Sequence, residues 1–280
     1  MHWVLQDNLY KEKGFDEMVE ALERLGVPYD LVKVVPFVGD MEPPLTDVVG
    51  PVICFGSYGM RHHAKRMGWN PGVFDLDAVG YDVQKEIFGD AMLNSDLVIC
   101  DFKDVPALMP SDPVFIRPVS DSKDFAGGVM YRDDIEEWVR MVCVIGEDFG
   151  DKLEPTTKVM MSSPKKILQE ARFFIVDGRV ATQSYYKFGT MVRYSRDVDR
   201  DLIWEANRLV CNHPMVIRRD ENGKEVPNQL NRLPRAFVLD LARLEDGSIK
   251  IVELNTINAA GLYDADVNAL VIALESMGLG

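Results

Sequence analysis

Three oxygen-bearing side chains near the C-terminal end of the sequence are spaced for metal chemistry. Asp240 lies inside the apolar run 237–241, and Glu253 and Asn255 end the apolar run 249–255. Because side chains alternate along a strand, Glu253 and Asn255 share one face. Oxygen donors of this kind suit Mg²⁺, which keeps some waters and takes further ligands from nucleotide phosphates. The alternative is a solvated strand face with Asp240 as a surface carboxylate.

The residues that follow favour the metal interpretation. Residues 256–261 read Thr-Ile-Asn-Ala-Ala-Gly, a loop of small side chains whose backbone can approach a ligand closely. An Asp on one strand, a turn, Glu-x-Asn-Thr and a small-residue loop resemble the C-terminal signature of the ATP-grasp superfamily. D-alanine–D-alanine ligases carry a closely similar Glu-x-Asn-Thr. The resemblance implies that Asp240, Glu253 and Asn255 hold Mg²⁺ on the phosphates of ATP.

A second group of residues fits a phosphate-binding loop. The apolar run 114–116 is followed by Arg117-Pro118, by Lys123 and by a Gly-Gly pair. Cations neutralise phosphate charge, and small residues let backbone N–H groups reach phosphate oxygens. Taken alone, the pattern is more often an ordinary surface turn.

The order of the two motifs strengthens the second one. ATP-grasp proteins place a basic residue, usually the lysine of a Lys-Pro pair, at the end of such a strand. Arg117, together with Lys123, resembles instead a phage and bacterial clade of the superfamily named for two arginines and a lysine. Arginine keeps the charge and offers a planar fork to phosphate. By this resemblance the nucleotide-binding residues of the loop are Arg117, Lys123, Phe125, Ala126 and Gly127.

Residues 160–187 supply two further parts of the family pattern. The resemblance places Ser162 and Ser163 near the adenine hinge, Glu170 near the nucleotide, and Arg172 facing the transferred phosphate. Lys187 adds a cation on the returning strand. Taken singly, a polar turn, a surface ion pair and an exposed strand end explain these residues as well. The four motifs stand in the family order over approximately residues 110–265.

The elements that must position these residues alternate between strand and helix. Apolar runs separated by helical patterns indicate a parallel α/β unit over about the first hundred residues. Two Asp-Gly pairs, at 177–178 and 246–247, each separate β-rich runs and predict hairpins. Helical spacing of apolar residues predicts helices at 14–25, 133–144, 199–211 and 266–277.

These elements predict an α/β (α+β) chain with the ATP-grasp fold, preceded by a Rossmann-like pre-ATP-grasp domain. The expected domains are residues 1–105 and 106–280, the second divided into subdomains 106–162 and 163–280. At the strand-to-helix turn, Gly56-Ser57 either meets an anionic substrate through helix N–H groups or is an ordinary loop.

Bulk properties exclude some classes of partner. A formal net charge of -14 argues against a large basic surface for nucleic acid. No window approaches the roughly 18 apolar residues of a membrane span, and residues 1–10 do not read as a signal peptide. The four cysteines follow no metal or redox spacing. We therefore expect a soluble cytoplasmic protein that binds neither nucleic acid nor a membrane.

The resemblance implies an ATP- and Mg²⁺-dependent ligase that joins a carboxylate to an amine through an acyl phosphate and releases ADP. Arg172 and Arg117 would neutralise phosphate charge, and backbone N–H groups at Gly261 would stabilise the tetrahedral oxyanion. The clade resemblance indicates a peptide or protein as the modified substrate. Two alternatives stay open: a nucleotide-binding module that engages a protein partner without catalysis, and an ATP-dependent phosphotransferase.

Overall fold

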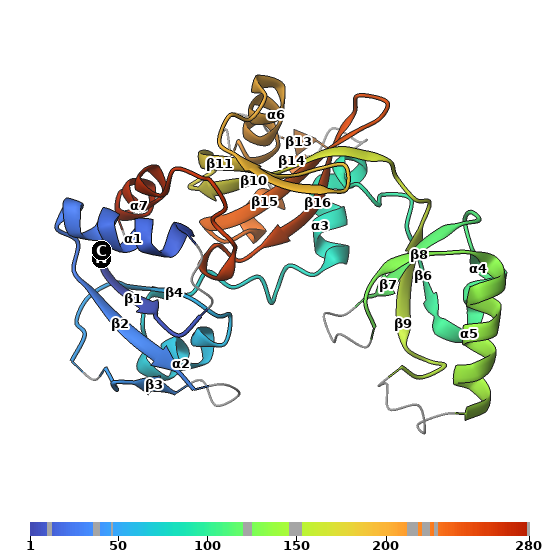
Figure 1. The fold of residues 1–280 in the computed structure, drawn as a ribbon, viewed down its shortest axis with the longest axis horizontal. Coiled ribbons are helices and arrows are strands. Elements are labelled where there is room, and N and C mark those ends of the chain that lie inside the picture. The colour runs from blue at the N-terminus through green and yellow to red at the C-terminus, as the bar shows by residue number, and fades with distance from the viewer. Residues whose placement is uncertain are drawn as a thin grey trace. The chain divides into compact units, whose positions relative to one another are not determined.

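The computed structural model of the chain describes residues 1–9, 13–35, 40–45, 47–119, 125–145, 153–211, 218–219, 225–226 and 229–278. Figure 1 shows the fold. The described part divides into two compact units, one formed by residues 1–91 with 167–280 and the other by residues 92–166. The three-part division at residues 105 and 162 rests on the family resemblance and stays a prediction.

A mostly parallel sheet begins the first unit and consists of β1 (His2–Gln6), β2 (Tyr29–Val34), β3 (Met41–Glu42), β4 (Val52–Phe55) and β5 (Pro71–Gly72). The strand order is β3-β2-β1-β4-β5, with β3 alone antiparallel to its neighbour among these described strands. Every residue of β4 is buried. Strands covered on both faces read as unbroken apolar runs, which explains the sequence at 51–55.

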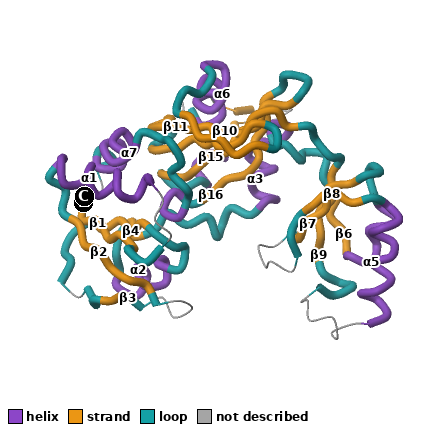
Figure 2. Tube along the Cα trace, in the orientation of Figure 1, coloured by secondary structure: helices purple, strands orange, loops and turns teal. Residues whose placement is uncertain are grey.

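Helices cover both faces of this sheet. On one face, Trp3, Leu5 and Ile53 pack against α1 (Lys13–Leu25) and α7 (Val267–Glu275). On the other face, Val4 and Cys54 pack against α2 (Met60–Met67). Figure 2 shows α1 and α7 side by side, although they come from opposite ends of the sequence. The apolar spacing of the sequence therefore predicted the helices but not their pairing.

An antiparallel sheet completes the first unit and consists of β10 (Ile167–Val176), β11 (Arg179–Phe188), β12 (Met191–Ser195), β15 (Ala236–Leu244) and β16 (Ile249–Asn255). The strand order is β12-β11-β10-β15-β16. Both predicted hairpins are confirmed: Asp177 and Gly178 turn with φ of 47° and 71°, as a tight turn between twisted strands requires. The helix α6 (Arg200–Val210) contacts β10, β11 and β15, while α7 contacts β10 and β11.

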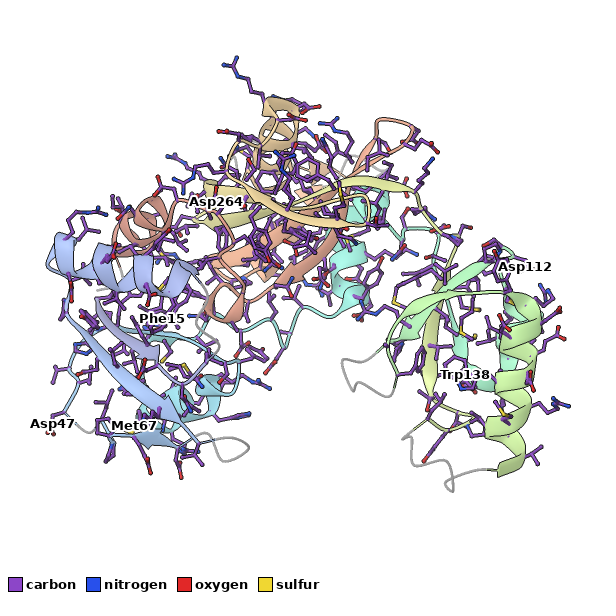
Figure 3. All side chains as sticks on the ribbon, in the orientation of Figure 1. Phe15, Asp47, Met67, Asp112, Trp138 and Asp264 are labelled. Atoms are coloured by element: carbon purple, nitrogen blue, oxygen red, sulfur yellow. The ribbon has the colours of Figure 1, made fainter. Side chains whose placement is uncertain are left out.

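The second unit is built on a separate antiparallel sheet of β6 (Val98–Asp101), β9 (Lys158–Ser162), β7 (Val114–Pro118) and β8 (Gly128–Met130), in that order. The helix α5 (Arg132–Ile145) packs on it through Ile135, Val139 and Val142. Figure 3 labels Trp138 on this helix, and its ring meets Phe125 edge to face at 5.0 Å.

The structure corrects one expectation here. The run 97–100 was expected to belong to the parallel unit of the first hundred residues, but β6 pairs antiparallel with β9. Local pattern identifies a strand, yet its partner depends on contacts with residues that are distant in sequence. The parallel pairing of the described strands ends at β5.

The remaining described elements are short: α3 (Tyr81–Phe88), α4 (Val105–Leu108), the strand pair β13 (Arg218–Arg219) and β14 (Glu225–Val226), and one-turn helices that include Ile257–Ala259. Cys54 and Cys100 are buried, as their apolar surroundings predicted. Burial raises the pKa of the Cys54 thiol to about 12. None of the described helices has both the length and the apolar character needed to cross a membrane.

Candidate functional site

A buried ion pair lies at the centre of the antiparallel sheet. Arg172 on β10 stands opposite Asp240 on β15. The guanidinium donates from Nε to Oδ1 at 2.9 Å and from Nη2 to Oδ2 at 2.8 Å. Arg172 is 8% exposed and Asp240 is 1% exposed. The surface alternatives for both residues are therefore wrong, and the pair is a fixed, two-point interaction of the strong kind.

Glu253 and Asn255 extend this pair along the next strand. Asp240 stands opposite Glu253 in register, and a bulge adjoins this position in β16. Asn255 Nδ2 donates to Glu253 Oε1 at 2.9 Å and to Asp240 Oδ2 at 3.3 Å. The predicted magnesium ligands are therefore neighbours in space. Glu253 is exposed while Asp240 is buried, so the group opens towards solvent on one side.

The donor set fits a hard divalent cation with an incomplete protein shell. It has two carboxylates and one amide; no group of three or more His, Cys, Asp or Glu side chains suited to a metal occurs in the described ranges. Mg²⁺ is commonly held by one or two carboxylates together with phosphate oxygens and water. A turn of the Asn255 amide would present its oxygen where Nδ2 lies now.

The electrostatics around the pair favour an additional cation. Burial raises the pKa of the Asp240 carboxyl; Arg172 opposes this, and the charges of Glu253 and Glu170 add to it. Burial disfavours the charged form of Arg172, but the hydrogen bonds and charge of Asp240 outweigh it, so the arginine pKa lies above its usual range. Asp240 is thus affected by two further carboxylates besides the arginine, an arrangement that a further cation would stabilise.

Aromatic rings enclose the Arg172 guanidinium. Its central carbon lies 4.9 Å from the ring centre of Tyr263 and 5.7 Å from that of Tyr186, within the range of cation–π attraction. Tyr263 stacks on Tyr186 and also on Tyr194 of β12. Tyr263 adopts a φ of 53°, unusual for a residue other than glycine. The rings restrict the rotamers of Arg172 and shield one side of its charge.

Glu170 and Lys187 form a second pair beside the first. Lys187 Nζ lies 2.7 Å from Glu170 Oε1, and the Tyr186 hydroxyl donates to Glu170 Oε2 at 2.9 Å. Glu170 is 6% exposed. Burial, followed by the charges of Asp240 and Glu170, raises the pKa of Tyr186 above its usual range, so this phenol stays protonated. Two of the predicted nucleotide residues therefore contact each other.

The small-residue loop joins the antiparallel sheet to the N-terminal sheet. Asn258, 2% exposed, accepts from Phe74 N at 2.8 Å and donates to Cys54 O at 2.5 Å. Its own carbonyl accepts from Gly56 N at 2.8 Å. At the other end of the loop, Gly261 O accepts from Arg172 Nη1 at 3.2 Å. The loop thus links the turn after β4 to the buried ion pair.

A pocket of about 430 Å³ lies against this loop. It is bounded by the turn after β4, the start of α1 and the loop itself; the lining residues are Leu9, Phe15, Met18, Phe55, Gly56, Ser57, Tyr58, Asn258, Ala259, Ala260, Gly261 and Leu262. Figure 3 labels Phe15 on α1. Gly261 belongs both to the pocket and to the Arg172 contact, so the pocket adjoins the charged group.

Other predicted site residues belong to the second unit. Arg117 ends β7, and a Cβ on Gly127 would lie 2.9 Å from that of Arg117, so the glycine lets the loop pass close to the arginine. Phe125 packs on the unit's core, and Ala126 lies beside it. Lys123 lies outside the described residues.

The predicted hinge serines take different roles. Ser162 ends β9 fully buried, and its hydroxyl donates to Asn94 Oδ1 at 3.0 Å. Ser163 N donates to Asp96 Oδ2 at 3.3 Å. Sequence reasoning missed Tyr263 and the anchoring role of Asn258, because an aromatic residue after a glycine and an Asn inside a loop carry no distinctive local signal.

Comparison with solved structures shows the class of the fold. D-cycloserine synthetase DcsG superposes with a TM-score of 0.58 at 14% identity, covering 98% of this chain and 99% of that one. ATP-grasp ligase PsnB, complexed with precursor peptide PsnA2 and AMPPNP, gives 0.57 at 12% identity over 99% and 96%. D-alanine–D-alanine ligase from Bacillus anthracis gives 0.57 at 14% identity over 99% and 97%. The chain has the ATP-grasp fold.

The family follows from the sequence comparison. Residues 60–274 match the ATP-grasp domain model of family 3 in the clade named for two arginines and a lysine, and the chain belongs to that family. A search of curated proteins finds no match. The resemblance to this clade is thus confirmed, whereas the residue-level assignments rest on the geometry given above.

Proposed function

We propose that this protein is an ATP- and Mg²⁺-dependent ligase that joins a carboxylate to an amine. The observation that carries the proposal is the continuous polar group formed by Arg172, Asp240, Asn255 and Glu253, with Gly261 on its border. Such a group holds a fixed cation beside a set of magnesium ligands, which is what transfer of a phosphoryl group requires.

The reaction has two balanced steps. A carboxylate oxygen attacks the γ-phosphorus of ATP, the bond to the β-phosphate oxygen breaks, and ADP leaves. An amine then attacks the acyl carbon, phosphate leaves, and the amine nitrogen loses a proton as the amide forms. Both steps need charge neutralisation and alignment more than a protein nucleophile.

Each residue of the first unit has a proposed role. Arg172 neutralises charge on the transferred phosphate, held rigidly by Asp240 and by two tyrosine rings. Asp240, Glu253 and Asn255 would hold Mg²⁺, which supplies charge neutralisation at the phosphates. Gly261, predicted to stabilise the oxyanion through its N–H, presents its carbonyl to Arg172, so it also positions the arginine.

Residues of the second unit keep the nucleotide roles that the resemblance implies. We propose that Arg117 and Lys123 bind the triphosphate, with Phe125, Ala126 and Gly127 forming the loop beside it. Ser162 and Ser163 lie at the adenine hinge. In the first unit, Glu170 and Lys187 complete the nucleotide site. PsnB in complex with a precursor peptide supports a peptide or amino-acid substrate for this chain.

A single substitution tests the metal assignment. Glu253→Gln keeps the shape of an exposed side chain and removes its charge, so we expect ADP release to fall by about 10²-fold or more with the free energy of unfolding nearly unchanged. Glu137→Gln makes the same change at an exposed glutamate of α5 and serves as the control. Normal ADP release from Glu253→Gln would mean that the metal assignment is wrong.

The assay also separates the alternatives. ADP release that rises on addition of an amine and a carboxylate supports ligation. ADP release with phosphate transferred to one added compound, and no amide in the products by mass spectrometry, indicates a phosphotransferase. ATP binding without any turnover indicates a binding module.

A further inference from the structure

The pocket beside the small-residue loop differs in character from the charged group that it adjoins. Its side-chain walls are contributed chiefly by Leu9, Phe15, Met18, Phe55 and Leu262. Among its described lining residues none carries a charged side chain. A site for a polar or charged substrate side chain would need a partner of opposite charge or a set of free hydrogen-bonding groups.

The polar side chains that do line the pocket are largely committed elsewhere. The amide of Asn258 is engaged by Phe74 N and Cys54 O. The Tyr58 hydroxyl donates to Asp77 Oδ1 at 2.6 Å. Ser57 N donates to Gln6 Oε1 at 2.8 Å. These groups fix the walls of the pocket and leave a surface that favours the burial of apolar atoms.

The pocket is a built feature of the fold. A Cβ on Gly14 would lie 2.5 Å from Leu262 Cβ, and one on Gly56 would lie 2.5 Å from Gln6 Cβ. Glycine at these two positions lets α1 approach the loop and lets the turn after β4 approach β1. The volume of about 430 Å³ is at the lower end of the roughly 300–1,000 Å³ of small-ligand sites, which suits one amino-acid-sized group.

We infer that this pocket binds the uncharged, apolar side chain of an amino-acid-like substrate whose reacting end lies towards Gly261. The inference rests on the proposed ligase function and names its substrate class. Gly261 borders the pocket on one side and bonds to Arg172 on the other, so a substrate held by its side chain has its reacting group beside the charged residues. A charged side chain would lose its hydration here without compensation.

The test compares single amino acids in the same ADP-release assay. Leucine, methionine and phenylalanine are added singly with ATP and Mg²⁺, against aspartate, lysine and serine at equal concentration. We expect the three apolar amino acids to stimulate ADP release at least about tenfold more than the others, the discrimination that an apolar pocket ordinarily provides. Equal or greater stimulation by the polar or charged amino acids would overturn the inference while leaving ligation intact.

A pair of variants links the preference to the pocket. Phe15→Lys places a charge at its wall and is expected to abolish the stimulation by leucine. Leu25→Lys makes a comparable change at the far end of α1, where the side chain is 41% exposed and outside the pocket, and is expected to keep it. Circular dichroism checks that both variants fold. Unchanged leucine stimulation in folded Phe15→Lys would also overturn the inference.

A second measurement separates failure of the pocket from failure of the ligase proposal. The melting temperature of the wild-type chain is recorded with AMPPNP, Mg²⁺ and each amino acid, because a ligand that binds the native state raises it. If no compound stimulates ADP release, the ligase proposal fails. In that case a melting-temperature rise for leucine but not aspartate, absent in Phe15→Lys, still supports the pocket. The absence of any such rise overturns the pocket as well.

Discussion

The buried pair of Arg172 and Asp240 yields the sharpest stability prediction. Asp240→Asn keeps the side-chain volume but removes the charge, and its amide presents N–H groups to one of the two guanidinium donors. Arg172 then stays buried at 8% exposure with its charge uncompensated. Removal of one partner from a buried pair costs about 3–5 kcal/mol, a large part of the roughly 5–15 kcal/mol that stabilises a typical protein.

Unfolding in urea measures this cost. The Trp138→Phe background removes the tryptophan of α5, so the remaining fluorescence reports the first unit, which contains Trp3, Trp69 and Trp204. We expect Asp240→Asn to lower the free energy of unfolding by about 3 kcal/mol or more.

A control and a double variant complete the experiment. Asp201→Asn removes a carboxylate that is 57% exposed from its contact with Arg243, and exposed pairs contribute about 0–1 kcal/mol. Replacing both buried partners, as Arg172→Met with Asp240→Leu, is expected to restore most of the stability because no charge stays buried alone. The double variant should still release no ADP. An Asp240→Asn cost no greater than that of Asp201→Asn would refute the reasoning, as would a double variant less stable than the single one.

Three further predictions concern the N-terminal sheet and the loop. Gly56→Ala should lower the free energy of unfolding by at least about 1–3 kcal/mol, since its Cβ would meet a β1 side chain at 2.5 Å; Gly59→Ala, at a helical φ of -60° with open space, should be neutral or slightly stabilising in the same urea assay. Asn258→Leu should cost about 2 kcal/mol or more because it leaves two buried main-chain groups unpaired; a cost near zero by urea unfolding would contradict this anchoring role. Burial and then the charge of a nearby arginine lower the pKa of His63 from 6.5, so the unfolded chain binds the proton more readily: stability should be full above pH 6.5 and fall as the pH drops below it. Melting curves at several pH values should show a smaller fall in His63→Gln than in the control His62→Gln.

The local sequence predicted much of this fold for identifiable reasons. The Asp-Gly turns at 177–178 and 246–247 predicted both hairpins, because few residues other than glycine suit the second turn position. Alternation along β16 placed Glu253 and Asn255 on one face, and the buried run at 51–55 predicted a covered strand. The order of four short motifs indicated the ATP-grasp family, because each motif is read from neighbouring residues alone.

Tertiary structure alone decided which segments meet. The sequence at 97–100 identifies β6 as a strand, but only its pairing with β9 places it in the second unit. Burial of Asp240 depends on Arg172, which lies 68 residues away in sequence. The apolar pocket forms because α1, the turn after β4 and the loop at 258–262 converge. Short-range preferences act over a few neighbouring residues, whereas these contacts depend on the packing of the whole unit, so no single stretch of sequence specifies them.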